Sequence, residues 1–443
     1  MAEIYFVSLG CDKNRVDAEI MMKRLINCGH VIAEDLDAAS VAIVNTCAFI
    51  ESAKEESLAV IFEMVRAKER DGAPLKAVLV TGCLAQRYGK ELRDELPEAD
   101  AVIALAHNDD ICEAVERVCG GSREILLCDD PEGLSIEGER ELSTPPHCAY
   151  IKIAEGCDNH CTYCAIPAIR GRYRSRLQKQ VVDEAKKLVA DGVKELILVA
   201  QDTTMYGADL KNGENLCSLL SEICKIDGLW RVRILYAYPS EITDELIALM
   251  AREEKIAKYI DIPMQHANDA VLKRMGRRET QLLLTELIKK LREAMPEIVI
   301  RSTFIVGFPG ESEIQFLELC DFLRAQRLDR VGFFAYSDEE GTAAQLLDKK
   351  NDGDIINKRK EALELLQSEI ILDKQEKCVG RCCEAVCEGF DMEREQFILR
   401  GEADAPDIDT LIYAAAENDL MPGEVYTVKA TKTDGVDLIA EIK

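Results

Sequence analysis

The feature that most constrains the fold is a regular alternation of short apolar runs with helical patterns. The apolar runs in the first third of the chain are rich in β-forming residues and cover residues 4–11, 41–47 and 77–83. Helical patterns at 17–28 and 52–70 lie between them. Strands that alternate with helices are typical of a parallel sheet. We therefore expect a parallel α/β domain over residues 1–128, followed by a linker at 129–147 that is rich in acidic residues, glycine and proline.

The same alternation continues over residues 148–371. Six candidate strands fall there, at 149–155, 195–200, 232–238, 259–264, 299–306 and 331–335. The clearest helical patterns between them are at 180–191, 280–295 and 312–326. A closed barrel of this kind has eight β/α units, so six units predict a partial (β/α)6 barrel.

Residues 372–443 have a different pattern, in which short strand-like runs are separated by turns. The runs cover residues 382–389, 396–401, 411–414, 425–433 and 438–442. A helical run at 358–376 leads into them. Short, closely spaced strands are typical of a small all-β barrel. The expected fold class is therefore α/β, with an N-terminal parallel α/β domain, a central partial barrel and a C-terminal all-β barrel.

Composition limits where such a chain works. It has 443 residues and a formal charge of -27, and no apolar stretch approaches the ~18–20 residues that span a bilayer. The N-terminus lacks the basic and apolar regions of a secretory signal, so we expect a cytoplasmic protein with no membrane association. Its 18 cysteines then need a role other than disulfides, which are rare in that compartment. Clustered cysteines in such a protein predict metal or redox chemistry.

The strongest signal is a loop in which Cys157, Cys161 and Cys164 form the pattern C-x3-C-x2-C. It follows the first strand of the central segment, at the end where barrels of this kind place their active sites. A cubane 4Fe-4S cluster has four irons, each usually held by a Cys thiolate, so three ligands leave one iron open. An open iron can act on a substrate or cofactor. The alternatives are incidental cysteines or a zinc site, which His160 would complete.

A second set of three cysteines is spread over the N-terminal segment. Cys11, Cys47 and Cys83 are spaced 36 residues apart, and each closes one of the apolar runs. If those runs are parallel strands, all three thiols emerge at the carboxyl ends, where open α/β sheets bind ligands. Three thiolates at one edge suit a further 4Fe-4S cluster with one open iron. The alternative is that each is a buried structural cysteine.

The cysteine loop, with Tyr163 directly before its last cysteine, resembles the radical S-adenosylmethionine (SAM) superfamily. The resemblance implies that the open iron of this cluster chelates the amino and carboxylate groups of SAM. Reduction then cleaves SAM to a 5′-deoxyadenosyl radical, which abstracts an unactivated hydrogen. The resemblance also implies an electron donor such as flavodoxin or ferredoxin.

Two three-cysteine sets in one chain resemble the methylthiotransferases over essentially the whole length, with the C-terminal barrel as the TRAM domain of that family. The resemblance implies two 4Fe-4S clusters, a SAM-binding cluster on Cys157, Cys161 and Cys164 and an auxiliary cluster on Cys11, Cys47 and Cys83. The auxiliary cluster would present a sulfur that one SAM methylates, while a second SAM supplies the radical. The other twelve cysteines, including the group at 378–387, fit no ligand position of the family.

Further residues resemble SAM-contacting positions of the superfamily. Tyr163 lies in the cysteine loop, Gln201 follows the second central strand, and Gly307 would let the backbone approach a ligand closely. The alternative is that Gly307 only allows an ordinary turn after the strand. Arginines also alternate after the loop, at 170, 172, 174 and 176. Such a run is usually a solvated face, but near an active site it can instead contact a carboxylate of SAM or of the substrate.

The substrate class is indicated by one motif and by charge. SLGCDKN at residues 8–14 resembles the RimO family of ribosomal protein aspartate methylthiotransferases, although Asp12 departs from the proline usual there. The tRNA enzymes more often show a Y-G-C-Q-x-N pattern. Residues 372–443 carry 8 basic and 17 acidic side chains, which disfavours nucleic acid as substrate because RNA binding depends on neutralising phosphates.

An acidic barrel suits a basic protein partner, as ribosomal proteins are. The resemblance to the RimO family implies methylthiolation at the β-carbon of an aspartate in the small-subunit ribosomal protein of the decoding centre. The alternative enzyme is a tRNA adenosine methylthiotransferase. Outside the enzymes, the alternative is a non-catalytic iron–sulfur protein, against which the two three-cysteine sets argue.

Overall fold

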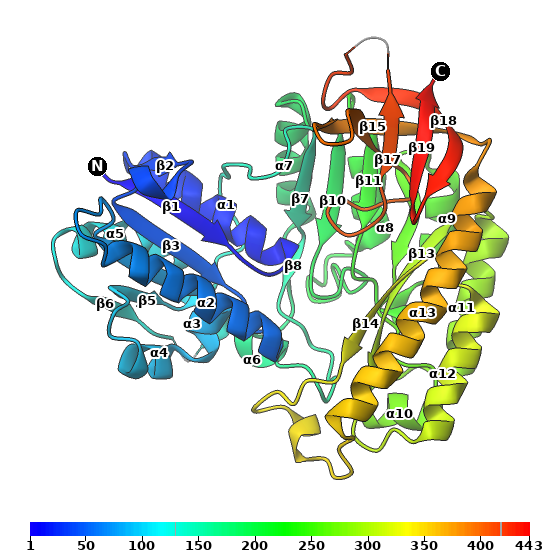
Figure 1. Cartoon of the computed structure of the whole chain (residues 1–443), viewed down its shortest axis with the longest axis horizontal. Helices are drawn as coiled ribbons and strands as arrows, with labels where there is room; N and C mark the ends of the chain where they lie inside the picture. The colour runs from blue at the N-terminus through cyan, green and yellow to red at the C-terminus, as the bar shows by residue number, and fades with distance from the viewer. Residues whose placement is uncertain (129, 417–418) are drawn as a thin grey trace.

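Three sheets organise the chain in the computed structural model, which describes residues 1–128, 130–416 and 419–443 (Figure 1). Asp129, at the start of the predicted linker, and residues 417–418, in the predicted barrel, lie outside the described residues. Among the described residues, no helix combines the length and apolarity needed to cross a membrane.

The first sheet is parallel and has six strands in the order β2-β1-β3-β4-β5-β6. They are β1 (Glu3–Ser8), β2 (Val31–Ala33), β3 (Val41–Thr46), β4 (Ala77–Gly82), β5 (Ala101–Ile103) and β6 (Glu124–Leu126). The connecting helices are α1 (Asp12–Asn27), α2 (Glu51–Lys68), α3 (Cys83–Arg87), α4 (Gly89–Glu95) and α5 (Ile111–Cys119). The predicted parallel α/β fold is confirmed. The sequence pattern misses β2, β5 and β6, because three residues are too few to show periodicity.

The second sheet is parallel and open, with the order β14-β13-β12-β11-β10-β7. Its strands are β7 (Cys148–Lys152), β10 (Glu195–Val199), β11 (Arg231–Ile234), β12 (Ile256–Asp261), β13 (Val299–Val306) and β14 (Arg330–Ala335). The predicted partial (β/α)6 barrel is confirmed. Two predicted strand ends are wrong, because β11 ends at Ile234 and β12 ends at Asp261. Tyr236, just beyond β11, has a φ of 61°, which ends the extended conformation.

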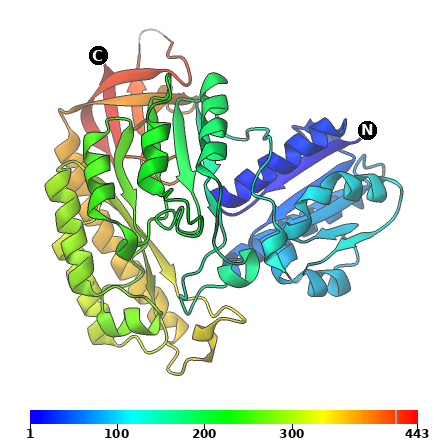
Figure 2. The same ribbon diagram turned by 180° about the vertical axis from the view of Figure 1, so that it is seen from behind.

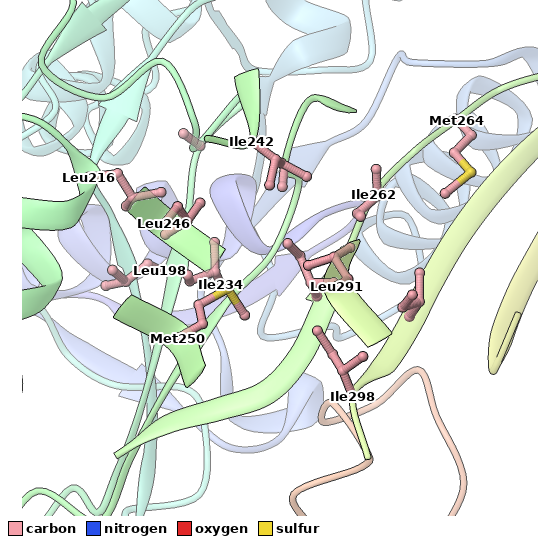
Figure 3. Packing of buried hydrophobic residues seen from close by; sticks show 14 of the residues in the cluster. Leu198, Leu216, Ile234, Ile242, Leu246, Met250, Ile262, Met264, Leu291 and Ile298 are labelled. Atoms are coloured by element: carbon pink, nitrogen blue, oxygen red, sulfur yellow. The ribbon is translucent and has the colours of Figure 1, made fainter. Parts of the chain in front are cut away.

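Helices cover the outer face of this second sheet (Figure 1, Figure 2). They are α7 (Gln178–Ala190), α8 (Leu216–Ile223), α9 (Asp244–Arg252), α11 (Gln281–Ala294), α12 (Glu313–Gln326) and α13 (Gly353–Cys378), while the short α10 (Asp269–Arg274) follows β12. The core between sheet and helices is continuous and apolar, with Leu198 and Ile234 from the strands packed in one cluster with Met250 and Leu291 from the helices (Figure 3).

The inner face of the second sheet is covered by segments from other parts of the chain. Because strand side chains alternate between faces, Ile197 and Val199 point inward while Leu196 and Leu198 point to the helices. The inward cluster also contains Tyr150, Tyr259, Val16 and Ile20 of α1, and Ala405 of the C-terminal segment. Helix α1 therefore lies between the first sheet and β7 (Figure 1). The segment after residue 130 crosses α1, where the amide of Glu141 donates to the carbonyl of Glu19 at 3.0 Å.

The third sheet is a closed five-stranded barrel in the order β15-β16-β17-β19-β18, which confirms the predicted C-terminal fold. Its strands are β15 (Cys382–Asp391), β16 (Gln396–Gly401), β17 (Ile412–Ala415), β18 (Val425–Asp434) and β19 (Asp437–Ile442). The barrel packs on the amino ends of the central strands (Figure 2). There the buried Arg400 pairs with Glu195, the first residue of β10, at 2.6 Å. Burial would raise the pKa of Glu195, but Arg400 and Arg233 outweigh it and lower that pKa to about 2.

Candidate functional site

The three cysteines of the N-terminal segment lie at one edge of the first sheet. Cys11 caps α1, Cys47 directly follows β3, and Cys83 opens α3 directly after β4. The sequence pattern predicts that each cysteine closes a strand. In the structure each one instead stands one to three residues beyond the end of its strand. Because β1, β3 and β4 are adjacent and parallel, their carboxyl ends share an edge. A methyl group on Gly10 would lie 2.8 Å from the Cβ of Cys47, so the turns after β1 and β3 are in contact.

Burial raises the pKa of two of these three thiols. Burial raises the pKa of Cys83 to about 12, with Arg170 opposing the rise and Cys11 and Cys47 adding to it. Burial also raises the pKa of Cys47, and Cys11 contributes. These mutual effects require the three sulfurs to be near one another. Such thiols give up their protons when they bind metal, so the donor set fits a thiolate-bound cluster.

The second three-cysteine set lies in the loop between β8 (Ala154–Glu155) and α6 (Ile166–Arg170). The backbone N–H of Cys157 donates to the carbonyl of Gly171 at 3.1 Å, which closes the loop. The amide of Asn159 donates to the sulfur of Cys157 at 3.4 Å, and Arg277 donates to the sulfur of Cys161 at 4.0 Å. Cys157 also lines a cavity of about 460 Å³. N–H donors aimed at sulfur are the surroundings expected for thiolate ligands.

Neither set is arranged around a single metal ion. Among the described residues, no three His, Cys, Asp or Glu side chains are close enough to hold one ion. The thiolates of a cubane bind different irons and lie further apart than the ligands of one ion, so this finding agrees with a cluster on either set. The same finding gives no support to a metal site among the cysteines at 378–387.

Arg170 connects the two sets. It ends α6, six residues after Cys164, and is 1% exposed. Its Nη2 lies 3.6 Å from the sulfur of Cys83 and 3.3 Å from Oδ1 of Asn14. Its Nη1 faces carboxylates, at 2.9 Å from Glu155 and 3.0 Å from Asp17. One guanidinium therefore spans from the SAM-type loop to the edge of the first sheet.

Two cations and two carboxylates are buried together at this junction. Lys152 pairs with Asp17 and, at 2.7 Å, with Glu155, so the group of Lys152, Arg170, Asp17 and Glu155 has no net charge. Burial would raise the pKa of Glu155, but Arg170 and Lys152 lower it to about 2. Removing one partner from such a group typically costs about 3–5 kcal/mol because it leaves an uncompensated charge. The group therefore fixes α1 against the central sheet.

Lys13 and Tyr236 form a second contact between the two sheets. The Lys13 Nζ lies 3.3 Å from the centroid of the Tyr236 ring, and the Tyr236 hydroxyl donates to Asp12 at 2.9 Å. Burial, Asp12 and Cys11 hold the pKa of Tyr236 well above its ordinary value. Since Tyr236 follows β11, this contact joins the carboxyl edge of the central sheet to the turn that carries Cys11.

The predicted SAM-contacting residues lie in different surroundings. Tyr163 packs edge-on against Phe308, with 6.5 Å between the ring centroids. Gln201 follows β10, and its Nε2 is buried with no hydrogen-bond partner. A Cβ on Gly307 would lie 2.3 Å from Ile356, so this glycine is required for packing against α13. The roles of these three residues toward SAM stay predictions.

Only the two ends of the alternating arginine run are buried, since Arg172 is exposed and Arg174 is half-buried. Arg170 is buried as described, and Arg176 is buried with Glu184 at 2.6 Å. Both arginines contact carboxylates of the protein itself. Sequence reasoning misses the Arg170–Cys83 and Arg277–Cys161 contacts, because the partners are 87 and 116 residues apart and no local pattern signals them.

Comparisons with family models divide the chain into the same three parts. The Radical SAM superfamily matches residues 151–323, the Uncharacterized protein family UPF0004 matches residues 3–104, and the TRAM domain matches residues 379–442. A solved radical S-adenosylmethionine methyltransferase, TsrM from Kitasatospora setae, shares the fold with a TM-score of 0.55 and 16% identity, over 74% of this chain and 72% of that chain. Fold and cysteine loop together define a radical SAM enzyme, a class that uses SAM and a 4Fe-4S cluster.

Full-length relatives narrow the class to one family. The ribosomal protein uS12 methylthiotransferase RimO of Lachnoclostridium phytofermentans is 44% identical over 438 residues, 99% of either chain. The protein of the same name from Pelotomaculum thermopropionicum is 46% identical over 441 residues, again 99% of either chain. The chain belongs to the RimO family of radical SAM methylthiotransferases.

Proposed function

We propose that this enzyme adds a methylthio group to the β-carbon of an aspartate in ribosomal protein uS12. The observation that carries the proposal is the pair of three-thiol sets at the strand ends of two sheets, joined through Arg170. A radical enzyme that also transfers sulfur needs two such centres. The relatives that share 41–46% of their residues with this chain are named for uS12, which supports that substrate over tRNA.

Each thiol set has its own task in this proposal. Cys157, Cys161 and Cys164 hold the SAM-binding cluster, and Cys11, Cys47 and Cys83 hold an auxiliary cluster that carries the sulfur to be transferred. When bound, SAM and the two clusters supply the radical, the methyl group and the sulfur. The protein's part is to fix the positions of these groups and to keep water away. Tyr163, Gln201 and Gly307 border the SAM site.

The three sheets correspond to three domains, which we place at 1–128, 148–371 and 372–443, with a linker at 129–147. The acidic C-terminal barrel meets the basic uS12, since complementary charge steers association. A flavodoxin or ferredoxin delivers the electrons. A ribosomal protein as substrate implies that the enzyme works in the cytoplasm.

The test is an anaerobic reaction of the iron-loaded enzyme with SAM, sulfide and a strong reductant, followed by mass spectrometry. Purified uS12 and bulk tRNA are offered in separate reactions. We expect a methylthio adduct on one aspartate of uS12 and none on tRNA. An adduct on tRNA alone would overturn the proposed substrate, and 5′-deoxyadenosine with neither adduct would overturn the proposed sulfur transfer.

A further inference from the structure

Lys13 is a buried cation without a carboxylate partner. It lies in the first turn of α1, two residues after Cys11, and is 4% exposed. Its one described interaction is the contact of Nζ with the face of the Tyr236 ring at 3.3 Å. No carboxylate of the described residues lies within ion-pair distance of this nitrogen. The adjacent Asp12 instead accepts the hydroxyl hydrogen of Tyr236 at 2.9 Å.

Other buried cations around α1 are all paired. Lys152 and Arg170 share Asp17 and Glu155, and Arg140 pairs with Glu184 at 2.8 Å. An aromatic face stabilises an ammonium by about 0.5–2 kcal/mol, which does not replace an anion. Burying an unpaired charge is costly, so such a group signals a partner that arrives from outside the chain. Lys13 therefore marks a place for a negatively charged ligand.

The carboxyl edge of the central sheet, which Lys13 meets at Tyr236, carries two unsatisfied amide groups. Gln201, Tyr236 and Gln265 follow β10, β11 and β12, which are neighbours in the central sheet. The Nε2 of Gln201 and the Oε1 of Gln265 are both buried and have no hydrogen-bond partner. The same edge thus offers one unpaired cation together with amide groups that can donate and accept. The cation suits a carboxylate, and the free Oε1 of Gln265 suits a peptide N–H beside it, whereas Gln201 already belongs to the proposed SAM site.

We infer that Lys13 binds the side-chain carboxylate of the substrate aspartate and is a specificity-determining residue. The inference rests on the proposed function, which brings an aspartate to this edge. The β-carbon of aspartate is bonded directly to the carboxylate carbon, so an ion pair on the carboxylate fixes the C–H bond that must react. Lys13 lies two residues after Cys11, and its Nζ contacts Tyr236 at the carboxyl end of β11. This position places the substrate between the two thiol sets. Asparagine, which lacks the charge, leaves Lys13 unpaired and is rejected.

The experiment measures binding to the iron-loaded enzyme. Dissociation constants are determined for uS12, for uS12 with asparagine at the target aspartate, and for SAM. The variants are Lys13→Met, which keeps the apolar stem over Tyr236, and Lys13→Arg, which keeps the charge. Lys23→Met is the matched control, because Lys23 lies on the same helix and is paired with Glu141 at the surface. Iron content and thermal unfolding show that each variant is folded and loaded.

We expect the wild-type enzyme to bind the aspartate form at least tenfold more tightly than the asparagine form. Lys13→Met should bind the two forms within twofold of each other, Lys13→Arg should restore most of the preference, and Lys23→Met should keep all of it. If Lys13→Met retains the preference, or weakens SAM binding and not uS12 binding, the inference is wrong. A wild-type enzyme that binds the two forms equally would overturn the inference alone, whereas an enzyme that binds neither form of uS12 would contradict the proposed substrate.

Discussion

The two three-thiol sets are built in opposite ways. Cys157, Cys161 and Cys164 lie within eight consecutive residues of one loop, whereas Cys11, Cys47 and Cys83 come from three strands of a sheet. Local turns determine the first set, and the register of β1, β3 and β4 determines the second. The relative positions of the thiols in the first set therefore tolerate small shifts in the sheet beneath the loop. In the second set these positions depend on the whole N-terminal fold.

Each set nevertheless receives one buried arginine. Arg277 donates to Cys161 and Arg170 donates to Cys83. Arg277 belongs to the same central segment as its cysteine, but Arg170 comes from the central segment and reaches the N-terminal one. The auxiliary set is therefore completed only when the two sheets dock.

The largest expected effect separates the two sets by function. Changing Cys157, Cys161 and Cys164 together to alanine should abolish formation of 5′-deoxyadenosine, because no open iron is left to bind SAM. Changing Cys11, Cys47 and Cys83 together should leave that cleavage measurable while no methylthio product forms. Chromatography of 5′-deoxyadenosine and mass spectrometry of uS12 check both. If both triple variants lose SAM cleavage alike, the division of tasks between the sets is wrong.

The contact between the C-terminal barrel and the central sheet, which is remote from both sets, provides the second test. Glu195→Gln breaks the buried pairing with Arg400 and Arg233 and should lower the free energy of unfolding by about 3 kcal/mol at pH 7. The pKa of Glu195, at about 2, lies below its ordinary 4.5. Its carboxylate therefore stabilises the fold above about pH 4.5, and this contribution is lost as the pH falls toward 2.

Urea unfolding of the iron-free wild type and of Glu195→Gln at several pH values checks this result. The difference between the two proteins should be largest at neutral pH and should shrink below pH 4.5. Iron bound per chain should be unchanged in the loaded variant, because the junction touches neither set. Loss of iron from one set would show that the barrel also positions that set.

Two glycines provide a smaller and local test. Gly82 has a φ of +92°, and an added Cβ would lie 2.4 Å from the carbonyl oxygen of Thr46. Gly276 has a φ of +71°, and its added Cβ would lie 2.5 Å from the carbonyl oxygen of His160. Either change to alanine should cost about 2 kcal/mol. Gly82→Ala should lower the amount of iron bound by the auxiliary set. Gly276→Ala should lower the amount of iron bound by the cysteine loop.

Iron is counted for each set in the background of the opposite triple cysteine variant. Gly72→Ala is the matched control, since Gly72 has a φ of +76° but no atom within 4 Å of the added Cβ. It should cost stability through backbone strain alone and leave both iron counts intact. Equal iron loss in all three variants would mean that strain, and not displacement of a cysteine turn, causes the effect.

The smallest expected effect concerns the two arginines. Hydrogen bonds to cluster sulfurs influence the reduction potential, so Arg170→Lys should move the potential of the auxiliary cluster and Arg277→Lys that of the loop cluster. We expect each reduction potential to shift by about 60 mV to more negative values, which corresponds to a tenfold change in the equilibrium constant of a one-electron couple. Redox titrations followed by electron paramagnetic resonance check this. A shift that appears in both clusters for either variant would contradict separate tuning.

The sequence predicts the two sites unequally well. Three cysteines within eight consecutive residues are visible as a motif, and cysteines at three strand ends are visible once the strands are recognised. The contacts of Lys13 with Tyr236 and of Arg170 with Cys83 are not visible, because the partners come from distant segments. The start of α1 is missed for a related reason. Its first turns bury polar residues, among them Lys13, Asn14 and Asp17, so they lack the apolar pattern of an amphipathic helix.

The way the inner face of the central sheet is covered has a consequence for dissecting this enzyme. Tyr150, Ile197 and Tyr259 are shielded by α1 on one side and by the segment that contains Ala405 on the other. A fragment cut at the family-model boundaries would expose this apolar surface to water, and exposed patches of this kind drive aggregation. The three parts match separate family models, but the central one needs both neighbours to be a stable molecule. Shuffling any part between enzymes therefore requires that α1 and the residue 402–410 segment travel with the sheet they cover.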